Sequence, residues 1–233
     1  LVEVNVGGEH SKGGVQPALI YMHGGGWIQG SPETHWDITA RIAAWAEMTV
    51  ISVDYALAPE HPYPTAFLQC CAVLRWAHEK AVELGIDPAR FAIGGDSAGG
   101  NLAAAVALKA RDEKMALKAQ LLIYPACDFD RSRASYAENA EGPLLKVAGM
   151  ARTNALYCAD ETQLRIDPYI APLAAETHAG LPQAFIAVAQ NDPLRDSGRA
   201  YSEALKAEGV AVTEESGMGL IHGYLRSMEY CAD

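Results

Sequence analysis

The chain has 233 residues, and 50% of them are hydrophobic, which predicts one compact domain over residues 1–233. A formal net charge of −11, with no basic stripe, argues against nucleic acid and anionic membranes as partners. We find no apolar run of membrane-spanning length and no signal peptide, so we predict a cytoplasmic protein. The five cysteines show neither a disulfide framework nor a metal-ligand spacing, so we predict that they are reduced.

Strand-like and helix-like segments alternate along the chain. We predict strands over residues 18–22, 49–53, 90–93, 120–124, 184–189 and 210–213, and helices over 35–46, 64–84, 98–111 and 197–208. Such alternation requires crossover connections, so the predicted fold class is α/β, a mostly parallel sheet with helices on both faces. Ligands bind these sheets beyond the carboxyl ends of the strands, so the residues that follow each strand are the candidates for function.

A glycine-rich loop, His23-Gly24-Gly25-Gly26-Trp27, follows the first predicted core strand. Its backbone N–H groups are unshielded by side chains, so the loop could stabilise the oxyanion that forms on an attacked carbonyl. The alternative is a flexible glycine turn. We expect His23 to brace the loop, and Trp27 either to floor a substrate pocket or to be part of the core.

The segment Gly95-Asp96-Ser97-Ala98-Gly99 stands between a predicted buried strand and a strong helix former. It has the pattern G-x-S-x-G, which places a serine on a strained turn with its hydroxyl exposed. The bare pattern arises by chance, but its flanks supply the strand and helix that the motif requires. Neither glycine cluster has the spacing of a nucleotide-binding loop, so we predict Ser97 as a nucleophile.

The alternation lapses between residues 124 and 182, where only one helix is predicted, around residues 151–157. Loops of this length are usually functional. We therefore expect residues about 128–180 to include a lid over the active site, and the alternative is a surface loop without a function.

A serine nucleophile needs a base, and the base needs an acid that fixes its tautomer. Asp192 follows the predicted strand 184–189, and His222 lies in a glycine-flanked loop after the last strand. The order Ser, Asp, His is that of the α/β-hydrolases. Asp196 is the rival acid, but we expect it to charge the start of the next helix. The remaining histidines are interpreted as surface or packing residues: His10, His35, His61, His78 and His178.

Together these motifs resemble the hormone-sensitive-lipase-like esterases, the bacterial family IV branch of the α/β-hydrolases. The resemblance covers nearly the whole chain and rests on HGGGW at 23–27, DYALAPEHPYP at 54–64, GDSAGG at 95–100, DPLRDSG at 192–198 and IHGY at 221–224. It implies an α/β-hydrolase fold, with Ser97, Asp192 and His222 as the triad. The oxyanion donors that it implies are Gly25, Gly26 and Ala98.

The implied activity is hydrolysis of short- to medium-chain carboxylic esters through an acyl-enzyme, with no metal or organic cofactor and no partner beyond the small ester. A homodimer is left open. Two alternatives share the fold: an amide-cleaving relative such as an arylformamidase, and a non-catalytic small-molecule receptor. A truncated, inactive fragment is a third.

The sequence also departs from the family pattern. Ala56 replaces an arginine that usually follows Asp-Tyr, which removes a supporting ion pair. Only 22 residues precede His23 and 11 follow His222, whereas the family pattern has an N-terminal helical cap and a further C-terminal helix. We therefore expect a small, incomplete cap with its N-terminal segment missing.

Overall fold

The computed structural model describes residues 2–6 and 15–228; His10 and Cys231 lie outside this part of the chain. Its strands form one sheet in the order β1-β3-β2-β4-β5-β6-β7. Among the strands in the described residues, only β1 is antiparallel to its neighbour, and the other strand pairs are parallel. The predicted α/β class and mostly parallel sheet are confirmed. The strands are β1 (Val2–Val6), β2 (Gln16–Met22), β3 (Thr49–Val53), β4 (Ile86–Asp96), β5 (Ala119–Ile123), β6 (Gln183–Asn191) and β7 (Val212–Ile221).

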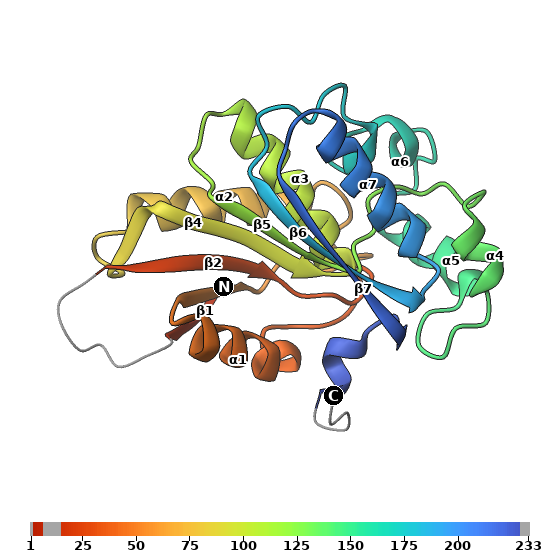
Figure 1. The fold of residues 1–233 in the computed structure, drawn as a ribbon, viewed down its shortest axis with the longest axis horizontal. Coiled ribbons are helices and arrows are strands. Elements are labelled where there is room, and N and C mark those ends of the chain that lie inside the picture. Colours follow the sequence, from red (N-terminus) through yellow and green to blue (C-terminus); the bar gives the residue numbers. More distant parts are fainter. Residues whose placement is uncertain (1, 7–14, 229–233) are drawn as a thin grey trace.

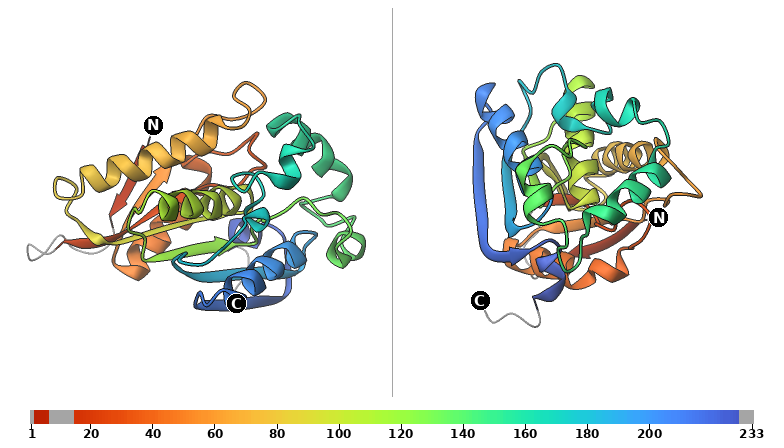
Figure 2. Two further views of the ribbon diagram at one scale, coloured as in Figure 1. Left: turned by 90° about the horizontal axis from the view of Figure 1, so that it is seen from above. Right: turned by 90° about the vertical axis from the view of Figure 1, so that its right-hand side faces the viewer.

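Helices cover both faces of this sheet. On one face lie α2, α3 and α7, and α1 lies on the other (Figures 1 and 2). The smaller helices α4, α5 and α6 form a group of their own beyond one end of the sheet (Figure 1). The helices are α1 (Trp36–Ala46), α2 (Thr65–Glu79), α3 (Ala98–Asp112), α4 (Ala134–Glu138), α5 (Val147–Tyr157), α6 (Gln163–Ile166) and α7 (Arg195–Ala207), with short 3-10 turns η1 (Glu33–His35), η2 (Pro172–Ala174) and η3 (Tyr224–Ser227).

The helix α3 lies at the centre of the core. Residues 98–108 are all buried, and most are alanine or glycine. Small side chains let a helix approach a sheet closely, and α3 contacts β4, β5 and β2. The turn before α3 is therefore held by packing on several strands.

Several element boundaries differ from the predictions, and β1, α4 and α6 were not predicted. The predicted helix 64–84 ends at Glu79, and β4 begins at Ile86 instead of residue 90. The last strand continues to Ile221, well past the predicted end at residue 213. The polar residues of this segment are compatible with a strand because β7 is an edge strand, so its polar side chains can face solvent while the backbone pairs with β6.

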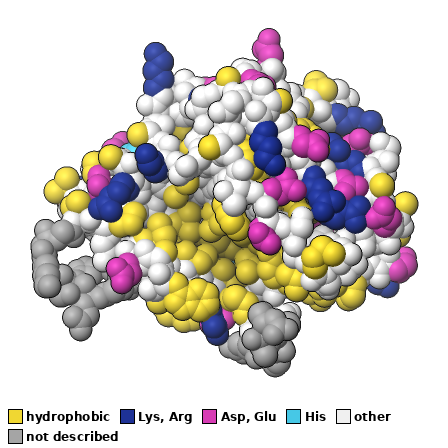
Figure 3. All heavy atoms as spheres, viewed as in Figure 1, with side chains coloured by type: hydrophobic (Ala, Val, Ile, Leu, Met, Phe, Trp, Pro, Cys, Tyr) yellow, Lys and Arg dark blue, Asp and Glu magenta, His cyan; other side chains and the backbone are white. Residues whose placement is uncertain are grey.

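The sheet face that carries α1 is covered only in part. Phe185 on β6 is 39% exposed, and its register partner Leu121 on β5 is half-buried. Figure 3 shows apolar side chains gathered across the middle of this view. Among the described residues, Cys70, Cys71, Cys127 and Cys158 are buried and free, as predicted. Within the same part of the chain, no helix is both long and apolar enough to cross a membrane.

Candidate active site

Ser97 occupies the tight turn between β4 and α3. Its backbone has φ +56° and ψ −118°, which is rare for a residue with a side chain and marks local strain. The end of β2 presses against this turn: a Cβ atom added at Gly99 would lie 2.0 Å from the carbonyl oxygen of Met22, and one added at Gly95 would lie 2.4 Å from it. The glycines at both positions are therefore required by this close approach.

The side chains of Ser97, His222 and Asp192 form one hydrogen-bonded chain. Ser97 Oγ lies 2.9 Å from His222 Nε2, and His222 Nδ1 lies 2.7 Å from Asp192 Oδ2. Asp192 is fully buried, and its second oxygen accepts a hydrogen bond from the Leu194 N–H at 2.8 Å. The three residues follow β4, β7 and β6, so the parallel sheet brings their strand ends together. In this geometry the imidazole can take the serine proton while the carboxylate fixes its tautomer.

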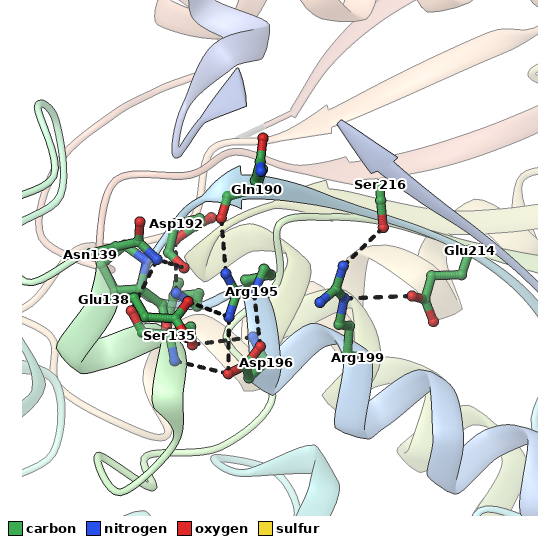
Figure 4. Close-up of polar contacts among 12 residues, drawn as sticks. Ser135, Glu138, Asn139, Gln190, Asp192, Arg195, Asp196, Arg199, Glu214 and Ser216 are labelled. Carbon is green, nitrogen blue, oxygen red and sulfur yellow. Dashed lines mark hydrogen bonds and ion pairs between the residues drawn. The ribbon is translucent and has the colours of Figure 1, made fainter. Parts of the chain in front are cut away.

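Asp196, the rival acid, has a different set of partners (Figure 4). It pairs with Arg195 and accepts a hydrogen bond from the Ser135 N–H of α4. Burial raises the pKa of its carboxyl, but the hydrogen bond from Arg195 and those from Ser135 outweigh burial and lower the pKa overall. Arg195 also pairs with Glu138. Asp196 therefore fastens α4 to the start of α7 and does not touch His222.

The same contacts support the turn that carries Asp192. The Ser135 hydroxyl donates to the carbonyl oxygen of Pro193 at 2.7 Å, and the Asn139 amide donates to that of Asp192 at 3.4 Å. Arg195 donates to the carbonyl oxygen of Gln190 at 3.2 Å. The acid of the triad thus sits on a turn held from the side by α4 (Figure 4).

The glycine-rich loop is wound tightly beside Ser97. Gly25 and Gly26 have φ values of +129° and +61°, and the Gly25 carbonyl accepts hydrogen bonds from Ile28 and Gln29. A Cβ atom at Gly25 would lie 2.0 Å from the Gln29 carbonyl oxygen, so only glycine fits there. The loop and Ala98, the first residue of α3, line the same cavity as Ser97 and His222.

Asp96, next to the nucleophile, anchors this loop, and sequence reasoning did not identify it. Its Oδ1 accepts hydrogen bonds from the Tyr21 hydroxyl at 2.8 Å and from the Gly24 N–H at 2.9 Å, and His35 Nε2 lies 3.5 Å away. Burial raises the pKa of the Asp96 carboxyl, but the His35 interactions and the other donors outweigh it and lower the pKa overall. The sequence does place a charged residue at the end of a buried strand, and because a buried charge needs hydrogen-bond partners, this position could have indicated such an anchor.

His23 braces the loop from beneath, as expected. Its ring stacks on that of Tyr55, with the centroids 4.2 Å apart, and its Nδ1 lies 2.8 Å from the Gly24 carbonyl oxygen. The Tyr55 hydroxyl donates to the His23 carbonyl at 2.7 Å. Burial lowers the pKa of His23. The imidazole is therefore part of the support for the loop.

The cavity above Ser97 has a volume of about 530 Å³. Trp27 fits both interpretations made from the sequence, because it lines the cavity and is also buried, stacked on Tyr157 with the ring centroids 4.5 Å apart. Much of the remaining wall comes from α4, α5 and residues 143–146, all within the predicted lid segment. Over the described ranges, no cluster of three or more His, Cys, Asp or Glu side chains is arranged to hold a metal ion.

Comparisons with known proteins agree with this geometry. A family model described as alpha/beta hydrolase fold matches residues 19–226. Esterase LipI of Mycobacterium tuberculosis is 45% identical over 211 residues, which are 90% of this chain and 66% of LipI. Carboxylesterase NlhH of the same organism is 44% identical, with 90% and 66% covered. The crystal structure of DphMB1 superposes with a TM-score of 0.94 at 45% identity, covering 98% of this chain and 75% of that one. The chain thus spans 66% of the length of the two esterases.

Proposed function

Because the chain belongs to the hormone-sensitive-lipase-like branch, bacterial family IV, of the α/β-hydrolases, we propose that it is a serine carboxylesterase acting on short- to medium-chain acyl esters. The observation that carries the proposal is the hydrogen-bonded chain from Ser97 through His222 to Asp192. The esterase names of the relatives LipI and NlhH support the same reaction class.

In the proposed reaction, His222 takes the hydroxyl proton of Ser97 as its oxygen attacks the ester carbonyl. The N–H groups of Gly25, Gly26 and Ala98 stabilise the negative oxygen of the tetrahedral intermediate, and each such donor is typically worth about 3 kcal/mol of barrier. His222 then protonates the departing alcohol, which leaves an acyl group on Ser97. A water molecule, activated by His222, then attacks the acyl carbonyl in the same way, which releases the acid and restores the serine hydroxyl. Throughout, Asp192 stabilises the imidazolium.

The size and lining of the cavity suit a small ester with an apolar acyl group. Its volume of about 530 Å³ is in the range of small-molecule sites, and Trp27, Leu145 and Met150 give it apolar walls. We propose that residues 128–180 form a lid within the single domain, since α5 and residues 143–146 close the cavity from that side. The cytoplasmic location and the homodimer remain predictions from the sequence.

Labelling by a fluorophosphonate, which reacts with activated serines, tests the proposal directly. We expect mass spectrometry to find the adduct on Ser97 and hydrolysis of p-nitrophenyl esters to fall from butyrate to palmitate. Ser97→Ala should lose both, whereas Ser132→Ala, a change at an exposed serine, should retain both. An anilide with the same acyl group separates an amidase from an esterase.

Absence of an adduct on the folded wild-type protein would overturn the proposal. So would an adduct that Ser97→Ala leaves in place. Hydrolysis that rises steadily from butyrate to palmitate would overturn the preference for shorter chains.

A further inference from the structure

The buried face of α5 carries an unpaired amide. The buried residues of this helix are Met150, Asn154 and Tyr157, which recur at helical spacing on one side. Asn154 is only 7% exposed and lines the cavity, and within the described residues we find no hydrogen bond to its side-chain amide. The amide keeps access to the cavity, so its hydrogen-bond partner can come from a molecule bound there.

This amide faces the cavity of the active site. Asn154 lines the same cavity as Ser97, so a bound molecule there could supply the missing hydrogen-bond partner. From the same helix, Gly149, Met150 and Thr153 also line the cavity, with Met150 one turn before Asn154.

The neighbours of Asn154 place it on the oxyanion-loop side of the cavity. The adjacent Thr153 lies against Gly26, where an added Cβ would be 2.7 Å from Thr153 Cγ2, and Tyr157 stacks on Trp27. The wall beside His222 is different: Leu144 Cδ1 lies 3.2 Å from the Cβ position of Gly223. His222 protonates the departing alcohol, so the alcohol leaves along the Leu144 wall. The acyl group then extends along the Asn154 wall.

We propose that Asn154 is a specificity residue that hydrogen-bonds a hydroxyl or carbonyl oxygen on the acyl group of the substrate. The inference rests on the proposed esterase function and narrows it: the preferred esters are those of hydroxy- or oxo-acids. A carboxamide can donate to a carbonyl and can both donate to and accept from a hydroxyl, so it recognises either group. A plain alkyl chain leaves the amide unpaired, and a substrate that lacks the polar group is penalised for this reason.

A matched pair of substrates tests the inference: p-nitrophenyl butyrate and p-nitrophenyl 3-hydroxybutyrate. The quantity measured is the ratio of kcat/KM for the hydroxy ester to kcat/KM for the plain ester. We expect Asn154→Leu to lower this ratio about tenfold, as the loss of one hydrogen bond to substrate predicts. Ala155→Ser, at an exposed position next to Asn154 on the same helix and outside the cavity lining, is the control and should leave the ratio unchanged. The corresponding ratio for 2-hydroxyethyl butyrate and ethyl butyrate, which differ only in the alcohol, should not respond to Asn154→Leu.

A ratio that is equal in wild type and Asn154→Leu, with both proteins active, would overturn the inference while leaving the esterase proposal intact. A folded wild-type protein that hydrolyses none of these esters would instead overturn the proposed function. Should the leucine variant not fold, Asn154→Ala gives the same comparison with less bulk. An alcohol-side response without an acyl-side response would overturn the assignment to the acyl group.

Discussion

Asp96 offers the sharpest test of how the site is built, because two buried donors depend on one of its oxygens. Asp96→Ala leaves the Tyr21 hydroxyl and the Gly24 N–H without their acceptor, and both residues are buried. At about 1–3 kcal/mol for each unpaired donor, we expect a loss of roughly 2–6 kcal/mol in the free energy of unfolding. For a chain of this size the melting temperature should fall by about 8–16 °C at the middle of that range.

The matched variant Asp96→Asn keeps an oxygen at the same place and removes the charge. We expect it to lose only about 1 kcal/mol, because both hydrogen bonds survive in neutral form. The loss in the free energy of unfolding of Asp96→Asn, relative to wild type, should depend on pH. The pKa of Asp96 is lowered in the folded state, so the charge stabilises the protein above the unfolded pKa of about 3.9 and this contribution is lost as the pH falls through the folded pKa. The difference between wild type and Asp96→Asn should therefore shrink below about pH 4.

Activity gives an independent readout of the same anchor. Asp96 holds Gly24, and the oxyanion loop continues directly from that residue. Displacing one oxyanion donor costs about 10²–10³ in kcat, so partial displacement in Asp96→Ala should lower kcat at least tenfold and change KM little. The measurements are thermal denaturation and steady-state hydrolysis of p-nitrophenyl butyrate at pH 7. An alanine variant that melts within 2 °C of wild type and keeps its kcat would refute the reasoning.

Two further predictions concern the triad and its turn. Asp192→Asn should lower kcat by a factor of about 10³–10⁴, because the correct histidine tautomer is lost. Asp196→Asn should keep kcat within a few-fold of wild type and lose about 1 kcal/mol in the free energy of unfolding. Equal losses of kcat in p-nitrophenyl butyrate hydrolysis would contradict the assignment of Asp192 as the acid. Gly99→Ala should prevent folding or lower the free energy of unfolding by at least 3 kcal/mol, because its Cβ would lie 2.0 Å from the Met22 carbonyl oxygen. Gly149→Ala, on helix α5 with nothing within 4 Å of the added Cβ, should raise the free energy of unfolding by up to about 1 kcal/mol. Denaturant unfolding of both variants measures these changes, and a stable Gly99→Ala would disprove the steric argument.

The parts of the fold and site that could be predicted are those that a local pattern or chain order carries. Alternating strands and helices fixed the α/β class, and parallel strands bring their carboxyl ends together. The approach of Ser97, Asp192 and His222 followed from this rule, since each residue stands just after a strand. Their catalytic roles and the lid remain predictions that the experiments above address.

The parts that could not be predicted depend on contacts between distant residues. Asp96 meets Gly24 and Tyr21 from 72 and 75 residues away, and no local pattern records those pairings. His35 was interpreted as a surface or packing residue, and it is buried, but nothing local indicates that its Nε2 lies 3.5 Å from Asp96. Asn154 stands in an ordinary helical stripe, and only the three-dimensional structure shows that the stripe faces the cavity.

The contacts between α4 and the turn after β6 set a limit on how this protein can be engineered. Segment 128–180 supplies walls of the cavity, and its α4 also holds the Asp192 turn through Ser135 and Asn139. Exchanging the whole segment for that of another protein would replace the cavity walls and would also remove the hydrogen bonds from Ser135 and Asn139 to the Asp192 turn. A graft limited to residues 143–157 would change the walls and keep α4 in place. Selectivity can thus be redesigned with the catalytic geometry preserved only when the splice point lies after Asn139.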